Sequence, residues 1–252
     1  MKYRHIAFAA ALIFGTAASI PAARAAGLRA VIELFTSQGC SSCPAADKLM
    51  GKLAGDPTLL TMSLPVDYWD YLGWKDTLAL HAHSERQRAY AEARGDRAVY
   101  TPQVVVNGVM HVLGSDRTAI EDAIAKTDSV AKPLVLPVAI SVADGKIVVN
   151  VPDAKDARRH GEVWLCPISG KVPVTIGRGE NRGRTLTYTN VVRNWVKLGE
   201  WNGKAETFTL PVTNLAGDHY SLKDIDHVVV LVQGGPDAKP GVMLGAATAD
   251  LH

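Results

Sequence analysis

The stretch TSQGCSSCP, residues 36–44, constrains the fold more than any other part of the chain. It follows an apolar run at residues 30–35 and precedes a segment of helical periodicity at residues 44–54. A strand here delivers Cys40 and Cys43 to the first turn of a helix. The helix N-terminus offers unpaired N–H groups and the positive end of the dipole, which favour a thiolate over a thiol. This arrangement is typical of a redox-active cysteine pair.

Residues 1–25 have the pattern of a secretory signal peptide. A basic start precedes an apolar run at residues 6–20, and Ala23-Arg24-Ala25 supplies an A-x-A cleavage pattern. The apolar run is shorter than the ~20 residues that span a bilayer, so we expect no retained membrane span. We expect cleavage near Ala25 and a secreted or periplasmic product.

The balance of charge argues against a nucleic-acid partner. The chain has 27 Lys+Arg and 25 Asp+Glu, but Lys2, Arg4 and Arg24 belong to the presequence. The mature chain therefore keeps 24 basic and 25 acidic residues, a net charge of −1. That leaves no excess of basic side chains to bind a polyanion.

The order of elements after the cysteines predicts an α/β unit. Residues 44–54 carry an apolar stripe at helical spacing, and residues 59–66 have the composition of a second strand. Strand–helix–strand spacing predicts a parallel βαβ unit. A second helix is expected to end at Gly95. It begins either at the capping-box pattern formed by Ser84 and Gln87 or earlier, near Asp76.

A β-hairpin is predicted immediately after Thr101-Pro102. Asn107-Gly108 lies between two apolar runs and predicts a type I′ turn, in which Val106 pairs with Val109. A third helix follows, with its apolar face at residues 119–124.

This order resembles the thioredoxin fold, in which the cysteines open the first helix and a cis-proline precedes the hairpin. More narrowly, the chain is similar to the secreted thioredoxin-like proteins of the DUF1223 family. The segments that carry this resemblance are 33–44 (ELFTSQGCSSCP), 66–74 (VDYWDYLGW), 100–103 (YTPQ), 179–183 (GENRG) and 190–193 (NVVR). The resemblance implies that Pro102 is cis and lies against the redox pair. The spacer departs from thioredoxin's Trp-Cys-Gly-Pro-Cys, so thioredoxin's reducing role is not inherited.

Short strands with frequent turn residues follow residue 133 and predict an antiparallel β-sandwich. The expected strands are 134–142, 146–151, 162–168, 184–192, 207–212, 227–233 and 242–249. The sequence therefore predicts an α/β thioredoxin-like N-terminal domain at residues 27–130. An all-β sandwich-like C-terminal domain is expected at residues 133–252.

The predicted function is thiol–disulfide exchange with protein or small-molecule thiols, including exported proteins. A Cys40–Cys43 disulfide closes a very short loop and removes little entropy from the unfolded chain, so a purely structural bond is poorly placed here. Cys40 is the expected attacking thiol and Cys43 the resolving thiol, with a mixed disulfide between the two steps. No cofactor is expected.

Thr101, Pro102 and Asp67 are the candidate supporting residues. A cis Pro102 would present the Thr101 backbone to an extended substrate; the alternative is an edge-strand proline that merely starts a hairpin. Asp67 ends the second predicted strand, where a buried carboxylate near Cys43 would accept its proton. Capping of local N–H groups is the alternative for Asp67.

Two other functions remain open from the sequence. Two thiolates at this spacing can hold a soft ion such as Cu(I), so a copper carrier that uses the same cysteines is one alternative. A non-catalytic interaction module is the other. His81, His83 and His111 are too sparse to predict a metal site shared with the cysteines. Cys166 is expected to be a small buried apolar residue.

Overall fold

The computed structural model describes residues 23–24, 27–154, 160–235 and 239–251. The predicted signal peptide and its cleavage site near Ala25 lie outside these residues, except that Ala23–Arg24 form the short strand β1. Within the described ranges, no helix is both long enough and apolar enough to cross a membrane.

The helices and the first five strands come from the N-terminal half of the chain. The helices are α1 (Pro44–Leu53), α2 (His81–Arg94) and α3 (Arg117–Ala131). The strands are β1 (Ala23–Arg24), β2 (Ala30–Thr36), β3 (Leu59–Pro65), β4 (Gln103–Val106) and β5 (Met110–Leu113). A 3-10 turn, η1 (Asp70–Leu72), lies between β3 and α2.

The C-terminal half contributes the remaining strands and two further 3-10 turns. The strands are β6 (Ala139–Ala143), β7 (Lys146–Val151), β8 (Gly161–Thr175), β9 (Thr185–Val192), β10 (Val196–Trp201), β11 (Glu206–Pro211), β12 (His227–Gln233) and β13 (Met243–Asp250). The turns are η2 (Val212–Leu215) and η3 (Leu222–Asp224).

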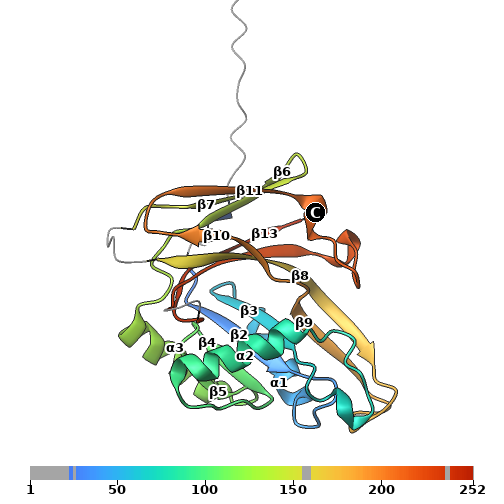
Figure 1. Ribbon diagram of the computed structural model, residues 1–252. Helices are drawn as coiled ribbons and strands as arrows, with labels where there is room; N and C mark the ends of the chain where they lie inside the picture. Colours follow the sequence, from blue (N-terminus) through green and yellow to red (C-terminus); the bar gives the residue numbers. More distant parts are fainter. Residues whose placement is uncertain (1–22, 25–26, 155–159, 236–238, 252) are drawn as a thin grey trace, which may run out of the picture.

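The strands form two sheets in a mixed α/β molecule (Figure 1). The larger is a mixed sheet of nine strands in the order β13-β12-β8-β9-β3-β2-β4-β5, with β10 paired to β8; the smaller has the order β1-β6-β7-β11. β2 and β3 are parallel, with Ala30 opposite Leu59, which confirms the predicted βαβ unit. β3 also meets β9, where Ser63 lies opposite Val191. Strands from both predicted domains therefore share one sheet.

β2 is buried on both faces. Ile32 and Leu34 pack in one core cluster with residues of α1 and α3. Val31 and Phe35 pack in another, with Tyr90 of α2. Because side chains alternate along a strand, α1 and α3 cover one face of β2 and α2 covers the other. β2 thus carries the cysteine segment out of the centre of the core.

The smaller sheet packs on the C-terminal part of the larger one. Ile140 of β6 and Val149 of β7 share a core cluster with Leu165 of β8, Trp201 of β10 and Val230 of β12. Each such side chain stabilises the fold by roughly 1.5–3 kcal/mol when it is fully buried. Apolar burial therefore holds the two sheets together.

The hairpin turn differs from the prediction in its register. Val106 lies opposite Met110 rather than Val109. Val109 belongs to the turn, and its N–H donates to the carbonyl of Val106 at 3.0 Å. Asn107 and Gly108 do have the positive φ that the turn signal demands, at 52° and 73°.

The predicted capping box at Ser84 is wrong, because α2 begins earlier, at His81. The Ser84 hydroxyl donates to the carboxylate of Asp67 instead. The predicted end of the helix is confirmed, since Gly95 is its left-handed C-cap.

Candidate redox site

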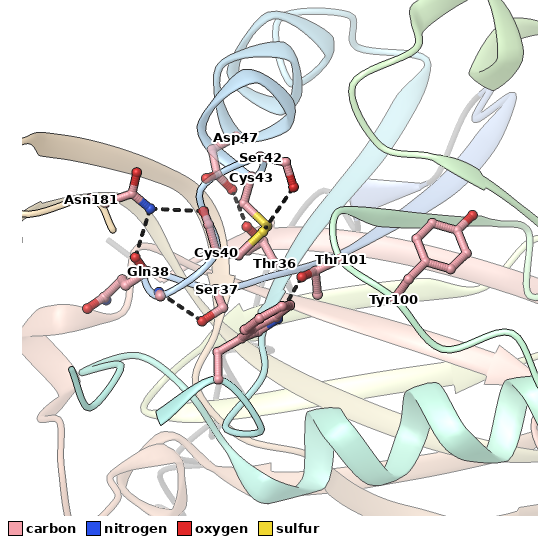
Figure 2. Close-up of a disulfide and its surroundings, with 12 residues drawn as sticks. Thr36, Ser37, Gln38, Cys40, Ser42, Cys43, Asp47, Tyr100, Thr101 and Asn181 are labelled. Carbon is pink, nitrogen blue, oxygen red and sulfur yellow. Dashed lines mark hydrogen bonds between the residues drawn. A yellow bond between two sulfur atoms is a disulfide. The ribbon is translucent and has the colours of Figure 1, made fainter. Parts of the chain in front are cut away.

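Cys40 and Cys43 form a disulfide at the N-terminus of α1, with 5.4 Å between their Cα atoms (Figure 2). Cys43 is the N-cap residue of α1, and Pro44 opens the helix, where a missing N–H donor costs nothing. Cys43 is completely buried and Cys40 is 2% exposed. The small exposed area of the pair therefore belongs to Cys40.

The surroundings of Cys40 favour its ionised form once the disulfide opens. The hydroxyl oxygen of Ser42, an exposed residue, lies 3.4 Å from the Cys40 sulfur. The positive end of the α1 dipole adds to the effect of a hydroxyl at this distance. Both features lower the free-energy cost of ionising the Cys40 thiol.

A buried carboxylate lies one helical turn beyond the disulfide. Asp47 is on the same face of α1 as Cys43, four residues away, and its Oδ1 accepts a hydrogen bond from the Thr36 hydroxyl at 2.8 Å (Figure 2). Its Oδ2 is buried and has no hydrogen-bond partner in the described part of the chain. Burial raises the pKa of Asp47 to about 7. The hydrogen bond from Thr36 opposes this rise, and the negative charge of Asp76 reinforces it. Asp47 is therefore poised to exchange a proton near neutral pH.

Asp76 holds the backbone that leads into the cysteines. Its Oδ2 accepts from the N–H of Gln38 at 2.7 Å, and its Oδ1 accepts from the N–H of Leu78 at 2.8 Å. Burial raises the pKa of Asp76 to about 6, although these hydrogen bonds oppose the rise. The indole N–H of Trp74 donates to the Gln38 side chain at 2.8 Å, so Gln38 is fixed from two directions.

Asn181, from the loop before β9, holds the same segment from the C-terminal half. Its Nδ2 donates to the backbone carbonyls of Gln38 and Cys40, both at 2.9 Å (Figure 2). Arg184 fixes the amide by donating to Oδ1 of Asn181 at 2.8 Å. Asn181 is completely buried. The shape of the cysteine loop, residues 37–43, thus depends on a residue 141 positions further along the chain than Cys40.

Thr101 and Pro102 lie in the segment that leads into β4, and Figure 2 shows Thr101 beside the disulfide. The Thr101–Pro102 peptide bond is cis. Thr101 Oγ1 accepts from the indole N–H of Trp69 at 2.7 Å. Trp69 also covers the cysteine loop, since a Cβ on Gly39 would lie 3.1 Å from the Cβ of Trp69. The fold therefore brings the predicted Thr101 to the cysteines and adds an aromatic cover.

Asp67 lies against the start of α2. Its carboxylate accepts from the Ser84 hydroxyl and is 2.7 Å from Nδ1 of His81. Burial opposes its ionisation, but the hydrogen bonds from Ser84 and His81 outweigh burial and hold the pKa of Asp67 below its ordinary value. The structure thus places Asp47, and not Asp67, one turn along the helix from Cys43.

The three histidines do not converge on the cysteines. His81 pairs with Asp67, His83 lies 2.9 Å from a backbone carbonyl at the end of β3, and His111 lies 2.9 Å from the Tyr100 hydroxyl. Among the described residues, no group of three or more His, Cys, Asp or Glu side chains is placed to hold a metal ion.

Cys166 lies in β8 as a free, completely buried cysteine, which confirms the sequence prediction. It packs in the core cluster that also contains Val31 and Phe35. Burial raises the pKa of its thiol above the ordinary range, so Cys166 is unreactive in the folded chain.

Sequence reasoning overlooks three residues of this site: Asp47, Asp76 and Asn181. An aspartate four residues after the second cysteine is a local signal, because both side chains then share one face of the helix. Asn181 lies in the GENRG segment, but no local pattern indicates that its amide reaches the cysteine loop. Its role becomes visible only in the folded chain.

Comparisons with known proteins identify relatives by sequence and by structure. A family model described as "Protein of unknown function (DUF1223)" matches residues 31–233. The crystal structure of protein AGR_C_4864 from Agrobacterium tumefaciens is similar, with 30% sequence identity, a TM-score of 0.78, and coverage of 90% of this chain and 96% of that chain. HBP35 of Porphyromonas gingivalis shares the fold alone, with 13% identity, a TM-score of 0.58, and coverage of 88% and 74%. No curated protein matches the chain.

Proposed function

The chain belongs to the DUF1223 family, and we propose from the geometry of its site that it is a thiol–disulfide oxidoreductase. The observation that carries this proposal is the position of the Cys40–Cys43 disulfide. The disulfide lies at the N-terminus of α1, one turn before the buried carboxylate of Asp47. A thiolate-stabilising helix end and a proton-exchanging group near neutral pH are what disulfide exchange requires.

The exchange starts from the oxidised pair. A substrate thiolate attacks the Cys40 sulfur, a substrate–Cys40 disulfide forms, the Cys40–Cys43 bond breaks and Cys43 leaves with the electron pair. A second substrate thiolate then attacks the substrate sulfur of the mixed disulfide, and Cys40 leaves as a thiolate. The substrate dithiol is oxidised to a disulfide, and the cysteine pair is reduced to the dithiol state.

Asp47 supplies the proton for the first step. With a pKa of about 7, its carboxyl group is largely protonated below neutral pH and donates a proton to the departing Cys43 thiolate. In the reverse direction, the ionised carboxylate takes the proton from Cys43. Ser42 and the start of α1 stabilise the Cys40 thiolate that leaves in the second step.

We also propose a thioredoxin-like N-terminal unit followed by a β-sandwich, in a protein exported by its N-terminal signal peptide. The element order β2-α1-β3-α2-β4-β5-α3 supports the first part, with α1 and α3 on one face of β2 and α2 on the other. The shared core of β6, β7, β8 and β12 supports the second part. Thiols or disulfides of other exported proteins, or small thiols, are the proposed substrates.

Trapping a mixed disulfide tests the proposed function. In Cys43→Ala, Cys40 has no resolving partner. We incubate this variant with a model peptide whose cysteine is held in a disulfide with an aromatic thiol. We expect Cys40 to form a mixed disulfide with the peptide and to release the aromatic thiol. Mass spectrometry should locate the added peptide on Cys40. The oxidised wild-type chain should oxidise a dithiol peptide, and Cys40→Ala, which cannot form the disulfide, should not.

The buried Cys166 supplies the matched control. Cys166→Ala should exchange at the wild-type rate, because its thiol lies in the core. Exchange that survives in Cys40→Ala, or no adduct in Cys43→Ala, contradicts the proposal. Stoichiometric Cu(I) binding that needs both cysteines, without any exchange, would favour the soft-metal carrier instead.

A further inference from the structure

A second candidate site lies between α2 and the C-terminal strands. It is a cavity of about 730 Å³, lined by α2 and by residues of β8, β10 and β12. None of its described lining residues comes from the cysteine segment at residues 36–47. Small-molecule sites have volumes of roughly 300–1,000 Å³, with aromatic walls and a few fixed polar groups. The size of this cavity falls within that range.

The walls of the cavity are rich in tryptophan. Trp164 and Trp195 meet edge to face, with 6.1 Å between ring centroids. Trp201 also lines the cavity. Flat side chains of this kind offer a large apolar surface to a planar ring, and offset-stacked or edge-to-face contacts add to the burial of area. The walls therefore fit a flat, conjugated ligand.

Arg86 forms the polar floor of the cavity and is held rigidly in place. Its Nε donates to Glu33 at 2.7 Å, and its Nη2 donates to the Tyr90 hydroxyl at 2.7 Å and to the Gln233 side chain at 2.8 Å. Its guanidinium carbon lies 4.2 Å from the ring centroid of Trp195. The side chain of Arg86 is only 10% exposed. Arg86 is thus fixed before any ligand arrives, which lowers the entropic cost of binding.

A free hydrogen-bond donor lies at the floor of the cavity. Nη1 of Arg86 donates no hydrogen bond to any described residue, whereas its other nitrogens are occupied. The indole N–H groups of Trp195 and Trp201 are also unpartnered in the described part of the chain, but both are buried away from the cavity surface. The amide nitrogen of Gln233 has no donor capacity left, since it donates to Tyr90 and to the carbonyl of Gly241. A ligand that reaches this floor can therefore offer a hydrogen-bond acceptor to Nη1 of Arg86.

The charge of Arg86 is already balanced. Glu33 is completely buried and pairs with Arg86, so the floor as a whole is neutral. The described acidic residues of the lining are Glu85, Glu92, Glu162 and Glu200, and its further described cations are Arg88 and Lys239. A carboxylate or phosphate would bring a negative charge to a floor whose only positive charge is already paired with Glu33. The acceptor should therefore be an uncharged oxygen.

We propose that this cavity binds an uncharged, planar aromatic molecule whose carbonyl oxygen accepts a hydrogen bond from Nη1 of Arg86. The tryptophan walls hold the ring, and Arg86 fixes its orientation. The site is separate from the cysteine pair, and its occupancy does not depend on the exchange chemistry.

Three naphthalenes of nearly equal size test this proposal against the full chain by isothermal titration calorimetry. They are 2-acetylnaphthalene, which has a ketone; 2-ethylnaphthalene, which has no acceptor; and 2-naphthoate, which has a charged acceptor. We expect one molecule of the ketone to bind about tenfold more tightly than the hydrocarbon, as one hydrogen bond to a charged donor allows. We expect 2-naphthoate to bind more weakly than the ketone.

Arg86→Lys keeps the charge opposite Glu33 and removes the guanidinium fork. We expect the ketone to lose its tenfold advantage in this variant while the hydrocarbon binds as before. Arg117→Lys, an exposed exchange of the same kind on α3, should leave all three affinities unchanged. The proposal is overturned if the wild type binds the ketone and the hydrocarbon equally, binds 2-naphthoate more tightly than the ketone, or binds none of the probes. These three outcomes concern the wild type, so they hold even if Arg86→Lys fails to fold.

Discussion

At the scale of single residues, the site combines a visible pair of cysteines with a carboxylate that the sequence conceals. Cys40 and Cys43 stand out because their spacing, the preceding apolar run and the following helix are all local features. Asp47 lies between the apolar positions of α1 and resembles an ordinary acidic residue in a first helical turn, where the dipole favours it. Only the packed structure shows that it is buried. Its pKa is consequently raised instead of lowered.

The free energy of unfolding of Asp47→Asn should exceed that of the wild type by a margin that grows as pH rises. Unfolded Asp47 ionises near pH 4, whereas folded Asp47 keeps its proton to about pH 7. Between these values only the folded chain holds the proton, so wild-type stability falls with rising pH, by up to ~1.4 kcal/mol per pH unit. Urea unfolding of both proteins at pH 4, 6 and 8 measures the growing difference.

An exposed aspartate provides the control for this experiment. Asp122→Asn on α3 should show no comparable change with pH. The same Asp47→Asn protein should also oxidise a dithiol peptide more slowly, and the ratio of wild-type to variant rate should fall above pH 7, as Asp47 loses its proton. A constant stability difference from pH 4 to pH 8 would show that Asp47 is not a buried acid.

At the scale of elements, the sequence predicts most strands and helices but not how they connect. The cysteine helix, the parallel pair β2 and β3, and the strands β7, β9 and β12 are confirmed close to their predicted bounds. β10 is not predicted, because a register shift between Lys197 and Gly199 interrupts its alternating pattern. The hairpin register is wrong by one residue, since no local rule places Val109 in the turn. Pairings such as β3 with β9 depend on contacts between distant parts of the chain.

Two Asx-Gly turns of similar backbone shape should differ sharply in their tolerance of alanine. Asn107 and Asp144 have φ of 52° and 51°, and each precedes a glycine. Asn107 is buried; its Oδ1 accepts from the N–H of Val31 at 2.8 Å and its Nδ2 donates to Thr127 at 2.8 Å. Asp144 is exposed.

Asn107→Ala should therefore destabilise the fold by ~3 kcal/mol, from the left-handed backbone and the lost buried hydrogen bonds. Asp144→Ala should cost only the backbone term, ~1 kcal/mol. Chemical unfolding of the two variants measures the difference. Equal losses would mean that the turn conformation alone, and not the bonds to β2 and α3, makes Asn107 important.

At the scale of the whole molecule, the two halves of the chain meet in one sheet and at one loop. Ser63 of β3 lies opposite Val191 of β9, and its hydroxyl donates to the carbonyl of Thr189 at 2.7 Å. Asn181 reaches the cysteine loop from the same half. The sequence predicts a domain boundary at residues 130–133, because short strands with frequent turn residues begin there. Cross-chain contacts of this kind leave no periodic trace in a sequence.

Asn181→Ala should loosen the cysteine loop from the far half of the chain. The carbonyls of Gln38 and Cys40 each lose a buried donor, at a cost of about 1–3 kcal/mol per group. Hydrogen exchange should speed up in the amides of residues 38–40, and global stability should fall. Arg182→Ala, an exposed neighbour in the same loop, should change neither quantity. Unaltered exchange in Asn181→Ala would show that Asp76 suffices to hold this loop.

The bonds from Asn181 also limit how this architecture can be recombined. A gene segment that encodes only the cysteine-bearing half carries the reactive sulfurs but omits the amide that shapes their loop. Grafting that half onto another scaffold, or exchanging the C-terminal half between relatives, would succeed only where the donor loop restores an equivalent amide. The unit that evolution can transplant with its reactivity intact is therefore the pair of halves together.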